Sequence, residues 1–429
     1  MVLYAVWVLP QIAAWRNVSL VVGAVAGVYI SWYYRADLVT KRALPIWFVG
    51  LLFVWATIHL FFLSQDPNLQ WTEYRGIWKR AGLAGLFALG FGLSIANTPR
   101  KWVWPLIFLA LLIPSLTYLL KWILTFYGQG LGFDVPAYLK VYYGSSRFYV
   151  PKTDYVVFCL PTLAVGLGGL QYLIVTKKLT VFKLISCLLL VLLPLFVFYG
   201  QNIKNGIVYA ALLFLTLFLI LLKYFLRRKI WLGLFSLLMV ATLSAVFAFY
   251  YIEKNPSLSS LYYDIKTSIK IDEYPQWRYS TGPNLPINEL GRQVSVSNYV
   301  RIAWAVVGLK LIAENPMGYG LIENSFSRLV EIKWPDGKNL YLSHSHSGWI
   351  DLILGIGIPG ILLIIIAMIL TLRNIRFLGL GERYFCSWLL SSIILLWCTT
   401  EVSANGNFDP LIFWIVFAGG LSLRNQKIT

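Results

Sequence analysis

Long apolar stretches alternate with short polar turns along the first 252 residues. Most of them are close to the roughly 20 residues that an α-helix needs to cross a hydrocarbon core about 30 Å thick. We therefore interpret them as membrane-spanning helices. They lie at 19–34, 44–64, 80–97, 102–124, 155–176, 181–200, 205–223 and 230–252. A shorter apolar stretch, 1–14, brings the whole chain to twelve spans if it is counted and to eleven if it is not.

One polar insertion of about 90 residues interrupts the pattern before three final apolar stretches. We expect three parts: nine spans in 1–252, a large loop in 253–345 that contains short helices, and three spans in 346–429. The second half of the loop predicts a helix over 299–313, capped by a serine and stopped by Asn315-Pro316. The candidate caps are Ser295 and Ser297, and the final spans are 347–372, 384–400 and 408–424.

Composition agrees with a membrane protein. Hydrophobic residues make up 59% of the chain and charged residues 13%, which excludes a soluble domain of this length. The four cysteines all lie within apolar stretches, where a free thiol behaves as a small hydrophobic group. Their spacing makes neither a disulfide framework nor a zinc site. The fold class that we predict is an all-α polytopic membrane protein with about twelve transmembrane helices.

The basic residues predict the orientation, because cytoplasmic loops retain Lys and Arg while short translocated loops are depleted of them. With twelve spans and a cytoplasmic N-terminus, six basic clusters fall on the cytoplasmic side. The insertion then lies on the opposite face, which is the periplasm in a Gram-negative bacterium. The clusters are Arg35/Lys41/Arg42, Arg100/Lys101, Lys177/Lys178, Lys223/Arg227/Arg228/Lys229, Arg373/Arg376/Arg383 and Arg424/Lys427.

The net charge of +18 is therefore mainly a sign of topology. Because the charges are divided among short turns, they form no continuous basic surface, and we expect no binding of nucleic acid.

Two of the three histidines, His344 and His346, lie where the insertion meets the next apolar stretch. A histidine at such a boundary can contact a lipid headgroup and a water-soluble group, and it titrates near neutral pH. Alternate residues in a turn point in different directions, so one of the two is expected to face a site and the other to support it. A metal site would need a third ligand, for which Asp351 is the only close candidate. His59, within an apolar stretch, is expected to be a hydrogen-bonded structural residue.

Arg301 falls in the first turn of the predicted helix 299–313. A cation is unfavourable there because the helix dipole is positive at this end, so Arg301 suggests an anionic partner that binds the helix end and the guanidinium together. A solvated surface arginine is the simpler interpretation of this feature taken alone.

The spacing after His346 carries a resemblance to a known family. His346-Ser347 is followed by nine residues and then by Gly357-Ile358-Pro359-Gly360, which resembles the histidine signature of the O-antigen ligase family. Upstream, Arg301-Ile302-Ala303-Trp304 and the turn from Asn315 to Gly320 are similar to two further motifs of that family. The family also has an arginine in a turn before the large loop; here the position is Lys204, which keeps the charge but lacks the bidentate guanidinium. A snorkelling interfacial lysine is the alternative interpretation.

The resemblance implies a GT-C-like glycosyltransferase in the bacterial inner membrane, with its active site facing the periplasm. It would transfer a polysaccharide from undecaprenyl diphosphate to a sugar hydroxyl of lipid A-core, with inversion and without a metal or other cofactor. His346 would be the general base, and Arg301 and Lys204 would stabilise the diphosphate. His344 and Arg292 are further candidate substrate-binding residues, and Arg278 and Arg147 are candidate contacts to acceptor phosphates. Its partners would be the lipid-linked donor, the lipid A-core acceptor and membrane lipids.

Two other functions stay open. A polymerase of the same superfamily would join lipid-linked repeat units and has overlapping motifs, although the histidine signature favours the ligase. A transporter of the same lipid would need internal repeats and ionisable residues near the middle of the bilayer. Lys183 and His59 are the nearest candidates for such residues, and a large domain on one face suits an enzyme better.

Overall fold

The computed structural model describes residues 2–9, 12–98, 102–128, 130, 132, 134–141, 149–226, 231, 260–278, 285–335, 344–399 and 406–423. The predicted span 230–252 lies almost wholly outside these residues, as does Arg147. Contacts divide the chain into two compact units, Met1–Leu213 with Pro359–Thr429 and Phe214–Ile358.

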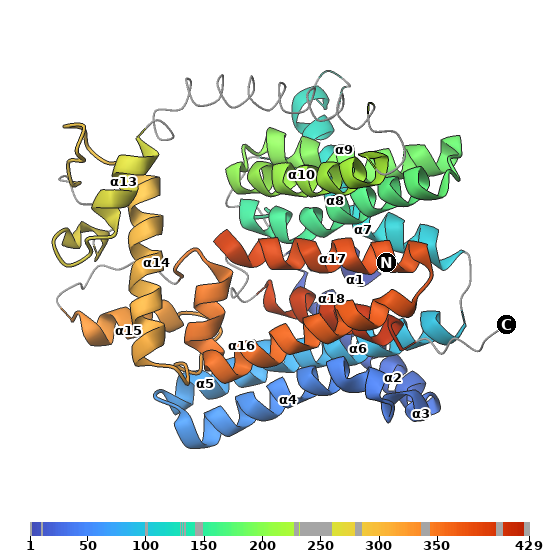
Figure 1. The fold of residues 1–429 in the computed structure, drawn as a ribbon, viewed down its shortest axis with the longest axis horizontal. Helices are drawn as coiled ribbons and strands as arrows, with labels where there is room; N and C mark the ends of the chain where they lie inside the picture. Colours follow the sequence, from blue (N-terminus) through green and yellow to red (C-terminus); the bar gives the residue numbers. More distant parts are fainter. Residues whose placement is uncertain are drawn as a thin grey trace. The chain divides into compact units, whose positions relative to one another are not determined.

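The first unit is a helical bundle (Figure 1). Its α6 packs against both α2 and α18 through glycines that let the backbones approach closely. A Cβ on Gly90 would lie 2.3 Å from Gly27 Cα, and one on Gly92 would lie 2.7 Å from Phe417 O. The main helices are α1 (Val2–Trp7), α2 (Ala13–Tyr33), α4 (Leu44–Ile58), α6 (Lys79–Asn97), α7 (Val103–Tyr127), α8 (Lys152–Thr176), α9 (Val181–Gly200), the start of α10 (Lys204–Leu226), α17 (Leu380–Thr399) and α18 (Phe408–Leu421).

A buried polar cluster joins four of these helices, α1, α2, α6 and α18. Asp409 of α18 is fully buried and accepts a hydrogen bond of 3.0 Å from Trp7 Nε1. Arg80 Nε of α6 lies 3.9 Å from the same carboxylate oxygen, and Arg16 of α2 interacts with the carboxylate electrostatically. Arg16 and Asp409 lie in the first turns of α2 and α18, whereas Arg80 lies within the continuous helical span Pro67–Asn97.

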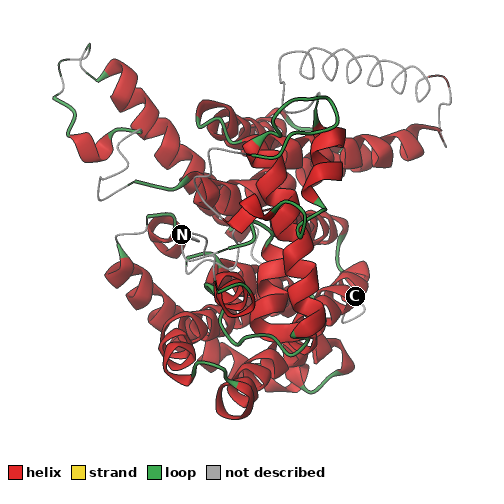
Figure 2. Cartoon of the chain, turned by 90° about the vertical axis from the view of Figure 1, so that its left-hand side faces the viewer, coloured by secondary structure: helices red, strands yellow, loops and turns green. Residues whose placement is uncertain are grey.

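The second unit is also helical, and Figure 2 draws helices and loops without a strand in the described residues. An isolated bridge pairs Ile287 with Gln293. The elements are α13 (Leu261–Ser268), η5 (Pro275–Arg278), α14 (Val296–Glu314), α15 (Ser325–Lys333) and the first part of α16 (Gly348–Asn374).

Asp264 of α13 joins three segments of this unit. Its buried carboxylate accepts hydrogen bonds from Asn288 Nδ2 (2.9 Å), Asn298 Nδ2 (3.0 Å) and the backbone N–H of Ser295 (3.2 Å). The acid therefore lies at the N-terminus of α14, where the helix dipole favours a negative charge. Ser295 occupies the N-cap position but makes no side-chain capping bond, so the expected serine cap is replaced by Asp264.

The all-α membrane class is confirmed. Nine helices of the described chain are long and apolar enough to cross a membrane by length and composition. One of them is α14, which falls inside the predicted outer loop, so the loop boundaries and the exact number of spans stay predictions. His59 is buried and hydrogen-bonded through Nδ1 to Gln70 Nε2 at 3.1 Å, which agrees with a structural role.

Three expectations need correction. The stretch 1–14 contains a helix of 6 residues, Val2–Trp7, which rises about 9 Å and is too short to cross a bilayer. The helix predicted over 299–313 begins three residues earlier, at Val296. The stretch 347–372 is a candidate span but not one continuous helix, because Gly357 has a non-helical backbone (φ 71°, ψ 175°) that divides α16.

Replacing Asp409 with alanine leaves the neighbouring arginine charges buried without their acid. Removing one partner of a buried ion pair costs about 3–5 kcal/mol, so we expect a large fall in the free energy of unfolding. Thermal unfolding in detergent measures the effect. Asp272→Ala is the control, since its carboxylate is 73% exposed beside Lys310, and should leave the unfolding temperature close to that of the wild type. Equal behaviour of the two variants would contradict a stabilising role for the cluster.

Candidate active site

The turn that contains the two histidines is held by Asp351, which lies in the first turn of α16. Its Oδ1 accepts a hydrogen bond of 2.8 Å from the backbone N–H of Ser345, and its Oδ2 lies 3.9 Å from His344 Nδ1. Both side chains are buried, at 7% exposure for His344 and 3% for Asp351. The backbone of Asp351 also donates to Ser347 O at 2.9 Å. Asp351 therefore fixes the conformation of the turn from inside, with His344 as its neighbour.

His346 projects from this turn toward α14. Its backbone is left-handed (φ 61°), a conformation that non-glycine residues adopt uncommonly and histidine more readily than most. The imidazole is half-buried against Trp304, with the ring centroids 5.1 Å apart and the planes inclined by 33°. A strained backbone at a half-exposed titratable residue is typical of functional sites.

Arg301 lies on α14 three residues before Trp304, so the two side chains share a face of the helix. Because Trp304 contacts His346, the structure brings Arg301 and His346 into one neighbourhood of the second unit. Arg301 is exposed and is the sixth residue of α14, in the second turn. The helix-dipole argument for an anion at Arg301 was therefore wrong, since the dipole effect is confined to the first turn.

A second layer of aromatic residues supports Trp304. The Trp304 indole donates a hydrogen bond of 3.1 Å to the carbonyl of Trp277, and the buried Trp277 indole donates to Ile271 O at 3.0 Å. Trp277 makes an edge contact with Trp334, with centroids 5.1 Å apart. The guanidinium carbon of Arg278 lies 5.3 Å from both of these rings. The surface on which His346 rests is thus a packed part of the unit.

A glycine-containing turn, 315–320, contacts the break in α16 through its backbone. The backbone of the 315–320 turn bonds to α16 where that helix breaks: Tyr319 N–H donates to Leu354 O at 2.7 Å, Gly320 N–H to Gly355 O at 2.8 Å, and Ile358 N–H to Pro316 O at 2.8 Å. A Cβ on Gly318 (φ 85°) would lie 2.5 Å from Gly357 N, and one on Gly357 would lie 2.2 Å from Met317 O. Two motifs identified separately in the sequence are therefore one contact, which we call the glycine seam.

Lys204 is the first residue of α10 and is exposed. It follows a tight turn in which Ile203 N–H donates to Phe198 O at 2.8 Å and Asn202 has a left-handed backbone (φ 51°). Lys204 belongs to the first unit, whereas Arg301 and His346 belong to the second.

Arg292 is exposed on a small turn closed by Asn288, whose backbone N–H donates to Arg292 O at 2.8 Å.

Within the described part of the chain, no group of three or more His, Cys, Asp or Glu side chains is placed to hold a metal ion. His344 and Asp351 form a pair, which is one ligand short of the usual protein set for catalytic zinc.

Two residues of the site were not assigned these roles from the sequence. Trp304 belongs to the motif that begins at Arg301, but nothing in the spacing shows that its ring contacts His346. The sequence offers Asp351 only as a candidate metal ligand, whereas it organises the histidine turn. Its position in the first turn of a helix, seven residues after His344, was a signal for this role.

Residues 188–365 match the family model described as O-antigen ligase. This segment belongs to the O-antigen ligase family. It contains Lys204, Arg301, Trp304, His346 and the glycine seam, so the family match covers the residues that the geometry brings together in the second unit. No match was found among the curated proteins.

The glycine seam predicts different effects for two substitutions at positive φ. Gly318→Ala adds backbone strain and a clash with Gly357, which together cost about 2–5 kcal/mol of unfolding free energy. Gly291→Ala has the same kind of backbone (φ 70°) but nothing within 4 Å, so it costs only the strain of about 1–2 kcal/mol. Unfolding temperatures and limited proteolysis in detergent compare the two. Equal destabilisation would mean that the seam is not tightly packed.

Proposed function

We propose that this O-antigen ligase family member transfers a polysaccharide from undecaprenyl diphosphate to a sugar hydroxyl of lipid A-core, at the periplasmic face of the inner membrane. The observation that carries the proposal is the placement of His346 on Trp304, three residues along α14 from Arg301, within the segment that matches the family. A candidate base and a candidate diphosphate ligand are thereby held in one neighbourhood.

In this reaction the acceptor hydroxyl oxygen forms a bond to the anomeric carbon of the donor sugar, while the bond from that carbon to the diphosphate oxygen breaks. His346 accepts the hydroxyl proton, and its half-exposed position leaves room for an acceptor. Attack opposite the leaving group inverts the anomeric configuration. The electron pair of the broken bond leaves with the lipid diphosphate. Because this diphosphate already activates the donor sugar, the reaction needs no nucleotide outside the cell.

Arg301 stabilises the charge that develops on the leaving diphosphate, and its planar guanidinium suits bidentate contact with phosphate oxygens. The resemblance also assigns Lys204 to the diphosphate. Its ammonium is a point charge and lacks the bidentate geometry of the family arginine. Arg292, which is exposed on its turn, is a further candidate for contact with phosphates of the acceptor.

Trp304 and Asp351 act as positioning residues. The indole supports one face of the imidazole and limits its rotation, while Asp351 fixes the backbone that presents His346. His344 is buried beside Asp351, so we assign it to support of the turn in place of direct contact with substrate. A packed support of this kind keeps the base within the narrow range of positions that proton transfer requires.

His346→Asn tests the proposed base, because asparagine tolerates the left-handed backbone but does not accept the proton. Purified protein is mixed with undecaprenyl-diphosphate polysaccharide and rough lipopolysaccharide in the presence of a chelator. We expect transfer by the wild type and a rate lower by about 10²–10⁴-fold in the variant. His344→Asn is the matched control, for which we expect a smaller loss of rate that accompanies a lower unfolding temperature.

The same assay separates the alternatives. Longer lipid-linked chains without transfer to lipid A-core would indicate a polymerase. Neither product, with movement of the lipid-linked donor across vesicles, would indicate a transporter. Full activity of His346→Asn would contradict the mechanism even if the product were that of a ligase.

Arg301→Lys tests the diphosphate contact. The positive charge is kept and the bidentate geometry is lost, so we expect kcat/KM to fall by about 10-fold or more. Arg328→Lys, at the exposed ion pair with Glu331 on α15, is the matched control and should behave like the wild type. The assay is the transfer reaction with donor concentration varied. An unchanged kcat/KM for Arg301→Lys would remove the arginine from the site.

A further inference from the structure

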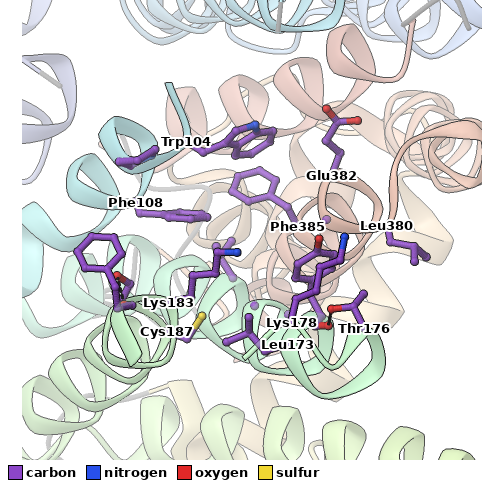
Figure 3. Close-up of a pocket in the computed structure, with 18 of the residues that line it drawn as sticks. Trp104, Phe108, Leu173, Thr176, Lys178, Lys183, Cys187, Leu380, Glu382 and Phe385 are labelled. Atoms are coloured by element: carbon purple, nitrogen blue, oxygen red, sulfur yellow. Dashed lines mark hydrogen bonds between the residues drawn. The ribbon is translucent and has the colours of Figure 1, made fainter. Parts of the chain in front are cut away.

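The first unit contains a large cavity that the proposed reaction does not use. Its volume is about 920 Å³, near the upper end of the roughly 300–1,000 Å³ typical of small-molecule sites. Figure 3 shows the side chains that line it, from α7, α8, α9 and α17.

Most of the lining is apolar. Trp104 and Phe108 of α7 and Phe385 of α17 cover part of the wall, and Leu173 and Cys187 cover another part. The outer rim is exposed and also apolar, with Phe182 75% exposed and Leu109 and Leu189 43% exposed. A cavity with an exposed apolar rim on membrane-spanning helices opens sideways to the hydrocarbon of the bilayer, from which a lipid chain can enter.

Three charged residues line the cavity. Lys178 and Lys183 project into it from the turn after α8 and from the start of α9, and Glu382 lines it from α17 (Figure 3). Two ammonium groups and one carboxylate leave one net positive charge. A single phosphodiester, which carries one negative charge, neutralises this set.

The position along α9 places the charged part of this cavity at the opposite end of the helix from Lys204. Lys183 is the third residue of α9, and Lys204 follows the other end of that helix. Nineteen helical steps from Val181 to Gly200 correspond to about 30 Å, which is the thickness of a hydrocarbon core. Lys178 belongs to a basic cluster that the positive-inside rule assigns to the cytoplasm. The charged part of the cavity thus lies at the cytoplasmic end of the helix.

We propose that the cavity binds one anionic phospholipid of the cytoplasmic leaflet, with its phosphate between Lys178 and Lys183 and an acyl chain in the apolar part. The lining residues are not among those assigned to the transfer reaction, and the preference for this lipid over the polyprenyl donor rests on the proposed function. The polyprenyl tail of the donor is a poorer match, because its diphosphate is needed at the opposite membrane face.

Native mass spectrometry of the delipidated full-length protein tests the proposal, with dioleoylphosphatidylglycerol and dioleoylphosphatidylethanolamine as probes. We expect the anionic lipid to bind more tightly, since only its net charge neutralises the site. In Lys178→Gln/Lys183→Gln its binding should weaken by about 10-fold or more. Ser186→Phe, which fills the cavity without changing charge, should weaken both lipids.

The matched control is Lys41→Gln/Lys177→Asn. It removes the same charge from exposed lysines on the same predicted face, neither of which lines the cavity, and asparagine tolerates the left-handed backbone of Lys177 (φ 55°). This variant should bind the anionic lipid like the wild type, and unfolding temperatures verify that all variants are folded. Equal binding of the two lipids, or equal loss in the control, would overturn the proposal. The proposal would also be overturned if the wild type retained undecaprenyl monophosphate in preference to phosphatidylglycerol and Ser186→Phe lost that retention.

Discussion

The close backbone contact between the 315–320 turn and the break in α16 is the constraint on which the site depends. Gly318 and Gly357 both have positive φ, and neither position has room for a Cβ. Hydrogen bonds from Tyr319 and Gly320 satisfy carbonyls at the end of the first part of α16, which the break would otherwise leave unpaired. This contact fixes where α14 ends relative to the break in α16. It thereby constrains the position of His346, which precedes α16, relative to Arg301 and Trp304 on α14.

Buried carboxylates complete the arrangement at the helix ends. Asp264 supplies the N-terminus of α14 with an acceptor, and Asp351 does the same for the turn before α16. At α14 the acid takes the place of a serine side-chain cap, whereas at α16 Ser347 Oγ accepts a hydrogen bond from Ile350 N–H and Asp351 holds the preceding turn. In the first unit Asp409 has the corresponding role among α2, α6 and α18. Polar contacts thus determine the positions of helices whose apolar faces alone would allow several registers.

The sequence predicted the class of protein, most of its apolar helices and the chemical types in the site, because hydropathy and motif spacing are local properties. It did not predict the break at Gly357, since the surrounding residues are apolar and the Gly-Ile-Pro-Gly sequence was interpreted only as a motif. The Asp409 cluster was also missed, because it joins positions 7, 16, 80 and 409, which no periodicity connects. The contact between Trp304 and His346 depends on the same long-range packing.

The central claim is that Arg301 and His346 act together on one transition state. Residues that act as a unit in catalysis show strongly non-additive effects when both are changed. The most direct measurement is a double-mutant cycle of kcat/KM for transfer to rough lipopolysaccharide, with Arg301→Lys, His346→Asn and the double variant. The account predicts that the double variant is hardly slower than His346→Asn alone. A loss equal to the product of the two single losses would show that the two residues act independently.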